Sequence, residues 1–191
     1  MAETVATWVA DYGMDGVDLD IEEGAGESWG VGENLVHFLR RLKQLQPEVI
    51  VGQPTYGFPQ IQAEIDVINV SWNVNASANG LASSIGIMVY DGTHSLTYVP
   101  NYAAATEQWE GFPIRVNVPE QDILVGCRGT ASPIDIMAMT FAAVEEDLLG
   151  IMVWYGSVRG GFQYETSWDA SEDAKAQETF IDAMNLMRSL E

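Results

Sequence analysis

Apolar residues along this chain recur at two spacings, one typical of helices and one typical of short strands. Val5, Val9 and Tyr12 lie on one face of a predicted helix over Glu3–Tyr12, which Gly13 ends. Further helices are predicted over Asn34–Gln46, Tyr102–Trp109, Ser132–Leu149 and Ser171–Leu190. Strand-like apolar runs occupy Met14–Glu22, Val49–Gln53, Ile65–Trp72, Ile85–Tyr90, Ile123–Gly126 and Ile151–Trp154.

The alternation of strands with helices predicts parallel β/α units, and the nearly continuous apolar strands fit a sheet buried on both faces. Residues 1–191 have enough apolar content for one core, so we expect a single domain. A closed (β/α)8 barrel usually needs ~250 residues. The sequence therefore predicts an α/β fold, a partial TIM-type barrel of about five or six parallel strands with helices outside, lacking its first two or three β/α units.

Within the segment Asp15–Glu22, aliphatic and acidic residues alternate from Val17 to Glu22. In a strand, Asp18, Asp20 and Glu22 share one face about 6.6 Å apart, and the aliphatic residues between them share the other. Like charges at this spacing raise the pKa of at least one carboxyl group. A proton donor beside stabilising carboxylates suits glycoside cleavage. The alternatives are an acidic surface strand or a Ca²⁺ or Mg²⁺ site, although no EF-hand spacing is present.

The charge and composition of the chain disfavour some classes of binding partner. The net charge of −20 disfavours nucleic acid and anionic membranes, whereas a neutral glycan needs no counter-charge. We find no apolar run of membrane-spanning length and predict no signal peptide, and the compartment stays open. The single cysteine, Cys127, excludes an intrachain disulfide and is predicted to be buried. His37 and His94 lack metal-ligand spacing, so neither a metal nor another cofactor is implied.

Three segments together resemble glycoside hydrolase family 18, the chitinases and their relatives. Asp15–Glu22 matches the DxxDxDxE signature at all four acidic positions. Met88–Asp91 is similar to the family's Met-x-Tyr-Asp strand, and Gly150–Trp154 to its last barrel strand, which ends in a tryptophan. Ile123–Gly126 resembles the strand between them. The resemblance runs from about Met14 to Trp154 and corresponds to the fourth to eighth strands of the family barrel.

The resemblance implies retaining hydrolysis of β-1,4-linked N-acetylglucosamine glycans, chitin or chito-oligosaccharides, with an endo-N-acetylglucosaminidase as a variant. Glu22 would be the general acid, and the 2-acetamido oxygen of the substrate would attack the anomeric carbon. Asp20 would orient the acetamido group, and Asp18 would share a proton with Asp20. Departures from the family are the missing first strands and Glu23, which stands where an aromatic residue is common.

The resemblance also implies substrate-binding residues. In the segment that begins at Met88, Tyr90 would hydrogen-bond the acetamido oxygen, and Asp91 would support that group. Trp154 would form the apolar floor under the sugar. An alternative alignment ends the sixth strand at Ser71–Asn73 instead and would remove these roles from Tyr90 and Asp91.

Two other functions stay open at the level of sequence. One is a lectin-like module that binds chito-oligosaccharides, although such relatives typically lose the acid at the position of Glu22. The other is an inactive barrel fragment, whose unpaired strand edge would favour self-association or pairing with an N-terminal fragment that completes the barrel.

Overall fold

The computed structural model describes residues 1–21, 32–59, 61–73, 80–90, 92–104, 114–128 and 133–154. Its strands are β1 (Gly16–Asp18), β2 (Ile50–Thr55), β3 (Ser84–Ile87), β4 (Ile123–Arg128) and β5 (Gly150–Trp154). Its α-helices are α1 (Ala2–Tyr12), α3 (Gly32–Leu45), α4 (Gln62–Ser71), α5 (Val99–Ala103) and α6 (Pro133–Glu145), with 3-10 helices η1 (Gly92–Tyr98) and η2 (Glu120–Asp122).

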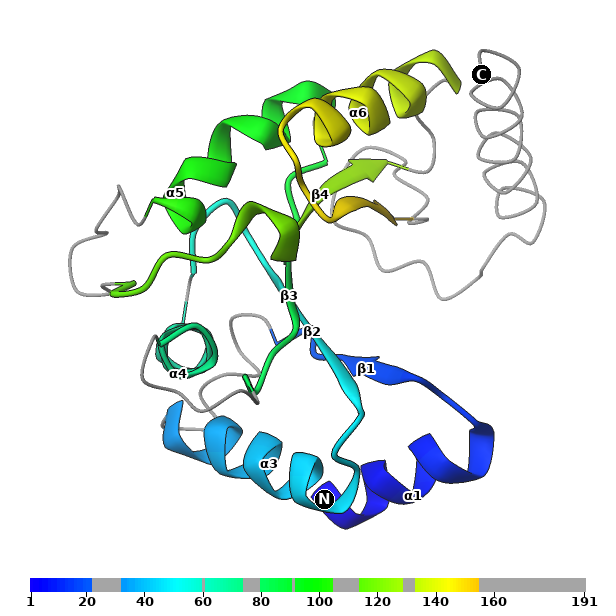
Figure 1. The fold of residues 1–191 in the computed structure, drawn as a ribbon, viewed down its shortest axis with the longest axis vertical. Helices are drawn as coiled ribbons and strands as arrows, with labels where there is room; N and C mark the ends of the chain where they lie inside the picture. The colour runs from blue at the N-terminus through cyan, green and yellow to red at the C-terminus, as the bar shows by residue number, and fades with distance from the viewer. Residues whose placement is uncertain are drawn as a thin grey trace, which may run out of the picture.

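The five strands form one curled half-barrel sheet. They pair in chain order, β1-β2-β3-β4-β5, and every pair is parallel. Helices α1 and α3 pack together beside β1 and β2, and α6 packs against β4 and β5 (Figure 1). The chain is thus a partial α/β barrel, which confirms the predicted fold class.

Two apolar clusters join the helices to one face of this sheet. The first lies under α4, α5 and α6 and includes Ile85, Ile87 and Val125 from the strands. The second lies under α1, α3 and α4 and includes Val51 from β2 and Leu39 from α3. In each strand these residues alternate with residues of the opposite face, so helices cover one side of the sheet. We call the opposite side, which carries Gly52 and Gly86, the inner face.

The prediction of a strand over Ile65–Trp72 is wrong, because this segment lies in helix α4. Glu64 accepts a hydrogen bond from the amide of Ile61 (3.4 Å), and this contact caps the helix start. The buried side chains of α4 recur at helical spacing and enter both apolar clusters, Val67 in the second and Ile68 in the first. β-Branched residues have low helix propensity, but burial on two sides outweighs it here.

Helices α1 and α6 are each followed by a residue in the left-handed backbone conformation. Gly13, at φ 63°, ends α1 as predicted, and the amides of Gly13 and Met14 bond back to the last turn. Helix α6 ends at Glu145, four residues before the predicted end at Leu149. Asp147 takes the same role there at φ 55°, which sequence alone did not indicate because glycine is the usual residue.

The other predicted helices differ in extent. Helix α3 agrees with Asn34–Gln46 to within two residues. Helix α5 begins before Tyr102 and ends at Ala103, while residues 105–113 lie outside the described ranges. The predicted helix over Ser171–Leu190 also lies outside them. No helix in the described ranges is both long and apolar enough to cross a bilayer.

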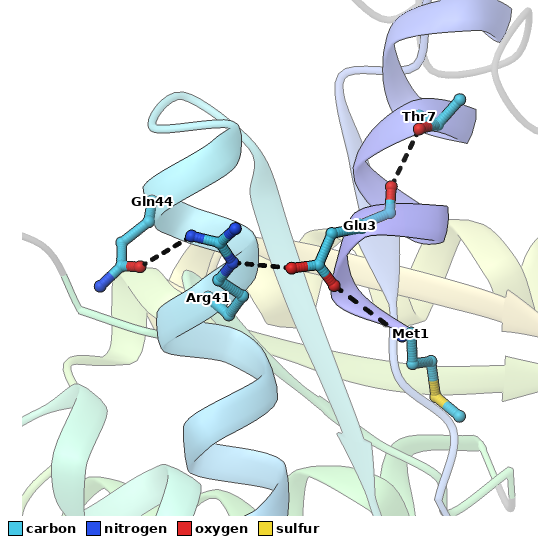
Figure 2. A network of polar contacts seen from close by, with 5 residues as sticks. All are labelled: Met1, Glu3, Thr7, Arg41 and Gln44. Atoms are coloured by element: carbon cyan, nitrogen blue, oxygen red, sulfur yellow. Dashed lines mark hydrogen bonds and ion pairs between the residues drawn. The ribbon is translucent and has the colours of Figure 1, made fainter.

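A polar contact on the surface joins helices α1 and α3. The guanidinium Nε of Arg41 in α3 donates a hydrogen bond of 2.8 Å to Oε1 of Glu3 in α1 (Figure 2). This bond lowers the pKa of Glu3, with the backbone and the positive charge of Arg41 adding to the effect. The N-terminal amine lies 3.9 Å from the same carboxylate. The pair is solvent-exposed, so it orients α1 on α3 more than it stabilises the fold.

Candidate functional site

The predicted site residues lie at or just after the carboxyl ends of three strands. Asp18 is the last residue of β1 and Asp20 follows it, Met88 and Tyr90 follow β3, and Trp154 ends β5. Because all five strands are parallel, their carboxyl ends meet at one edge of the sheet. In β/α barrels this edge carries the active site.

Glu22 and Asp91, two of the predicted site residues, lie outside the described residues. Only the backbone of Trp154 is described, and it pairs with Arg128 of β4. The geometry therefore concerns Asp18, Asp20, Met88 and Tyr90 and the residues around them.

The predicted alternation of packed aliphatic residues with acidic residues around β1 is present as far as Ile21. Val17, Leu19 and Ile21 pack against the cluster under α1 and α3, whereas Asp18 and Asp20 are exposed. The strand itself is shorter than the predicted Met14–Glu22, because it ends at Asp18. Beyond it the amide of Ile21 bonds to the oxygen of Leu19 (3.1 Å), a tight turn that replaces the sheet ladder.

Asp18 lies on the inner face, directly over Gly52 of the neighbouring strand. The two residues are paired in the β1–β2 register. A Cβ atom added at Gly52 would overlap Oδ1 of Asp18 and would lie 3.2 Å from its Cγ. Although Asp18 as a whole stays exposed, its carboxyl group lies against the strand and is partly shielded from water, and this desolvation raises its pKa. A raised pKa was expected for this acidic row from charge repulsion, but the cause at Asp18 is loss of water contact.

Tyr90 is placed in a similar way two strands further along the sheet, where it follows β3 and lies against β4. A Cβ atom added at Gly126 of β4 would lie 2.9 Å from Cδ1 and Cε1 of Tyr90, so the ring lies over this glycine. Strand β3 ends in a tight turn like that after β1, in which the amide of Val89 bonds to the oxygen of Ile87 (2.9 Å). The amide of Met88 bonds to the oxygen of Thr55 (2.6 Å), which fixes the end of β3 against β2.

The alternative alignment, with the sixth strand ending at Ser71–Asn73, is wrong. Ser71 closes helix α4, and Trp72 follows it with its indole bonded to Asp122 (2.8 Å). Strand β3, which leads into Met88, is the strand that lies between β2 and β4.

Sequence reasoning missed several residues that shape this edge. Gly52 and Gly126 receive the side chains of Asp18 and Tyr90, and Met152 of β5 reaches across the inner face to Gly86, with Sδ 2.9 Å from a Cβ added there. The fully buried amide of Gln53 donates a hydrogen bond of 3.2 Å to the oxygen of Leu19. Glycines in a strand indicate a close approach of another group, so the signal for Gly52 and Gly126 was present.

A buried tyrosine supports the loop after β2. The Tyr102 hydroxyl donates to the oxygen of Tyr56 (2.6 Å) and lies 3.1 Å from the Thr55 hydroxyl. The side-chain amide of Asn101 donates to the oxygen of Gly57 (2.8 Å). Burial raises the pKa of Tyr102 well above its ordinary value, so this hydroxyl acts as a structural donor.

Two hollows differ in their relation to these residues. One, of about 450 Å³, lies on the inner face and is lined by Asp18, Gly52, Gly86 and Met152 among others. It extends from Asp18 toward the amino ends of the strands, so it is the interior of the half-barrel below the predicted site. The larger, of about 1010 Å³, lies between α3, α4 and residues 115–117, and none of the predicted site residues lines it.

The described residues offer no cluster of three or more His, Cys, Asp or Glu side chains that could hold a metal ion. Cys127 is buried in the cluster under α6, as predicted, and burial raises the pKa of its thiol. It is therefore a packing residue in this structure.

Comparison with protein-family models finds none that matches this chain, and comparison with curated proteins finds no significant relative.

Proposed function

We propose that this chain hydrolyses β-1,4-linked N-acetylglucosamine glycans, such as chito-oligosaccharides, with retention at the anomeric carbon. The observation that carries the proposal is the geometry of the acidic segment: its aliphatic residues pack under α1 and α3, and Asp18 and Asp20 stay exposed at the carboxyl edge of a parallel sheet. This arrangement favours a cleft lined with carboxyl groups, and the DxxDxDxE pattern of Asp15–Glu22 supports the reaction.

The proposed reaction has two steps. Protonated Glu22 gives its proton to the glycosidic oxygen as the C–O bond breaks, and the acetamido oxygen of the same sugar bonds to the anomeric carbon. Water then attacks that carbon, returns a proton to Glu22 and regenerates the acetamido group. Asp20 stabilises the positive oxazolinium ion between the steps, and Asp18, whose pKa is raised, shares the proton of the pair.

The proposed contacts with the sugar involve the residues after β3 and the last residue of β5. Tyr90 hydrogen-bonds the acetamido oxygen, with Met88 and Asp91 beside it, and Trp154 stacks on the sugar ring. The position of the Tyr90 ring over Gly126 supports this role, because it keeps the ring on the same face of the sheet as Asp18.

Release of fluorophore from a 4-methylumbelliferyl chitobioside tests the proposal. We expect turnover by the wild-type chain and none by Glu22→Gln, a nearly isosteric change that removes the acid and keeps the fold. Equal rates for both proteins would refute the role of Glu22. A chain that binds chito-oligosaccharide in a calorimetric titration but never hydrolyses it would be a lectin-like module, and the proposed hydrolysis would be wrong.

We also propose a macromolecular partner, a segment of about three β/α units that completes the barrel. Ile50, which lines the hollow on the inner face, is 54% exposed, and Leu149 and Met14, which precede β5 and β1 along the chain, are 51% and 40% exposed. Within the described residues, β1 pairs only with β2. The five strands of the described residues need about three more to close an eight-stranded barrel. A second copy is disfavoured, because it brings ten strands and doubles a net charge of −20.

The partner is tested by mixing the chain with a polypeptide that holds the first three β/α units of a family 18 barrel. We expect a 1:1 complex in light scattering and slower hydrogen exchange at the amides of Gly16–Asp18. A stable homodimer of the chain alone, or no change in exchange on mixing, would contradict this assignment.

A further inference from the structure

Two successive residues of β2 contact the acidic segment from opposite sides of the sheet. Gly52 lies under the Asp18 carboxylate on the inner face, and its backbone oxygen accepts the amide of Leu19 (3.0 Å). Gln53 points to the helix-covered side, where its amide nitrogen donates to the oxygen of Leu19 (3.2 Å). Both peptide groups that flank Leu19 are thereby fixed, and Leu19 stands between Asp18 and Asp20.

We infer that Gly52 and Gln53 are positioning residues that set the orientation of the Asp18 and Asp20 carboxylates. No motif includes them, and neither is proposed to touch the substrate. The inference rests on the proposed function only for its effect on catalysis, because the contacts themselves exist whatever the chain binds.

The case for Gly52 is steric. Only a residue without a Cβ atom leaves room for the carboxylate of Asp18, and the nearest atom outside Asp18, Oγ of Ser84, is at an ordinary contact distance of 3.7 Å. The obstructing atom is the end of a side chain and not backbone, so an alanine at this position displaces the carboxylate and leaves the sheet in place. The glycine therefore determines where the carboxylate lies.

The case for Gln53 is one of hydrogen bonding. Its side chain is fully buried, and its Nε2 donates to Leu19 and also to the oxygen of Pro54 (3.0 Å). Its Oε1 is buried with no hydrogen-bond partner among the described residues. Burying an amide oxygen without a hydrogen-bond partner is unfavourable. The same side chain carries the Nε2 donor that holds the end of β1, and this contact gives a reason for a glutamine at this buried position.

The experiment is an NMR titration of the carboxyl carbons of the full-length chain. In Gly52→Ala we expect the pKa of Asp18 to fall toward the ordinary aspartate value, because the methyl group moves the carboxylate into water. Gly86→Ala is the matched control: it makes the same change on the same face, where the added carbon meets Sδ of Met152 at 2.9 Å. An unchanged Asp18 titration in Gly52→Ala, or an equal change in Gly86→Ala, would overturn the inference.

A double variant covers the case in which Gly52→Ala is too unstable to titrate. In Asp18→Ala/Gly52→Ala the obstructing carboxylate is absent, so we expect the stability lost in Gly52→Ala to be regained. A double variant as unstable as Gly52→Ala would show that the glycine serves the backbone and would refute the inference.

Gln53→Met, which keeps length but removes the donor, tests the second residue. We expect the carboxyl resonances of both Asp18 and Asp20 to shift, and unchanged resonances would exclude Gln53 from positioning. If the chain hydrolyses chitobioside, both single variants should lower kcat by about 100-fold with little change in KM. The NMR readouts stay valid if it does not, so failure of the proposed function and failure of this inference are distinguishable.

Discussion

The hydroxyl of Tyr102 in α5 donates a 2.6 Å hydrogen bond to the backbone oxygen of Tyr56, the first residue after β2. The same hydroxyl meets the Thr55 side chain at 3.1 Å. One buried phenol thus ties a distant helix to the carboxyl end of a central strand, next to the predicted site.

Tyr102→Phe should destabilise the fold by about 1–3 kcal/mol, because it leaves the partly buried backbone oxygen of Tyr56 and the buried Thr55 hydroxyl without this partner. Urea unfolding followed by circular dichroism measures the change. Tyr12→Phe is the matched control, since Tyr12 is 76% exposed, and it should have no measurable effect. A Tyr102→Phe variant as stable as the control would contradict the assigned hydrogen bonds.

Asp18 predicts a pH-dependent stability. Because its pKa is raised in the folded state, the folded chain holds a proton that the unfolded chain releases. The free energy of unfolding therefore falls as pH rises from the ordinary aspartate value to the raised one. Asn cannot ionise, so Asp18→Asn should be more stable than wild type at about pH 7 and equally stable at about pH 3.

Asp11→Asn is the control for that comparison, because it removes the same charge from an exposed position of α1. Removing any negative charge reduces the self-repulsion of a chain with net charge −20. Subtracting the effect of Asp11→Asn removes this general contribution from the comparison. If Asp18→Asn and Asp11→Asn change stability equally at every pH, burial of Asp18 has no energetic consequence.

The end of α1 provides a test of backbone conformation alone. Gly13 has φ 63°, and nothing lies within 4 Å of a Cβ atom added to it. Gly13→Ala should cost about 1–2 kcal/mol from the left-handed conformation without any steric clash. Gly13→Asn should cost less, because asparagine tolerates this region. Equal stability of all three proteins in thermal unfolding would show that the helix end rearranges.

The sheet could be predicted because its strands are short apolar runs in regular alternation with amphipathic helices. The alternation of Val17, Leu19 and Ile21 with acids also predicted which side of β1 is packed. The error at Ile65–Trp72 has a physical origin, since β-branched residues in a short apolar run are ambiguous between strand and buried helix. The tertiary structure determines that this segment is a helix, because α4 places buried side chains in both apolar clusters.

Details of the site depended on contacts between strands. The sequence placed Asp18 and Tyr90 on strand ends but gave no partner for either. Gly52 and Gly126 became meaningful only once the register put them beneath those side chains. The hydrogen bond from Gln53 to Leu19 joins residues 34 positions apart, and no local pattern announces it. The cause of the raised pKa at Asp18, burial, likewise required the fold.

The most direct test of the proposed hydrolysis is proton NMR of the first sugar released from a β-linked chito-oligosaccharide, recorded before the anomers equilibrate. Attack by the substrate's own acetamido group and then by water inverts the anomeric carbon twice, so the β-anomer should appear first. Glu22→Gln should form no product. Initial appearance of the α-anomer, or the same product from Glu22→Gln as from wild type, would contradict the account.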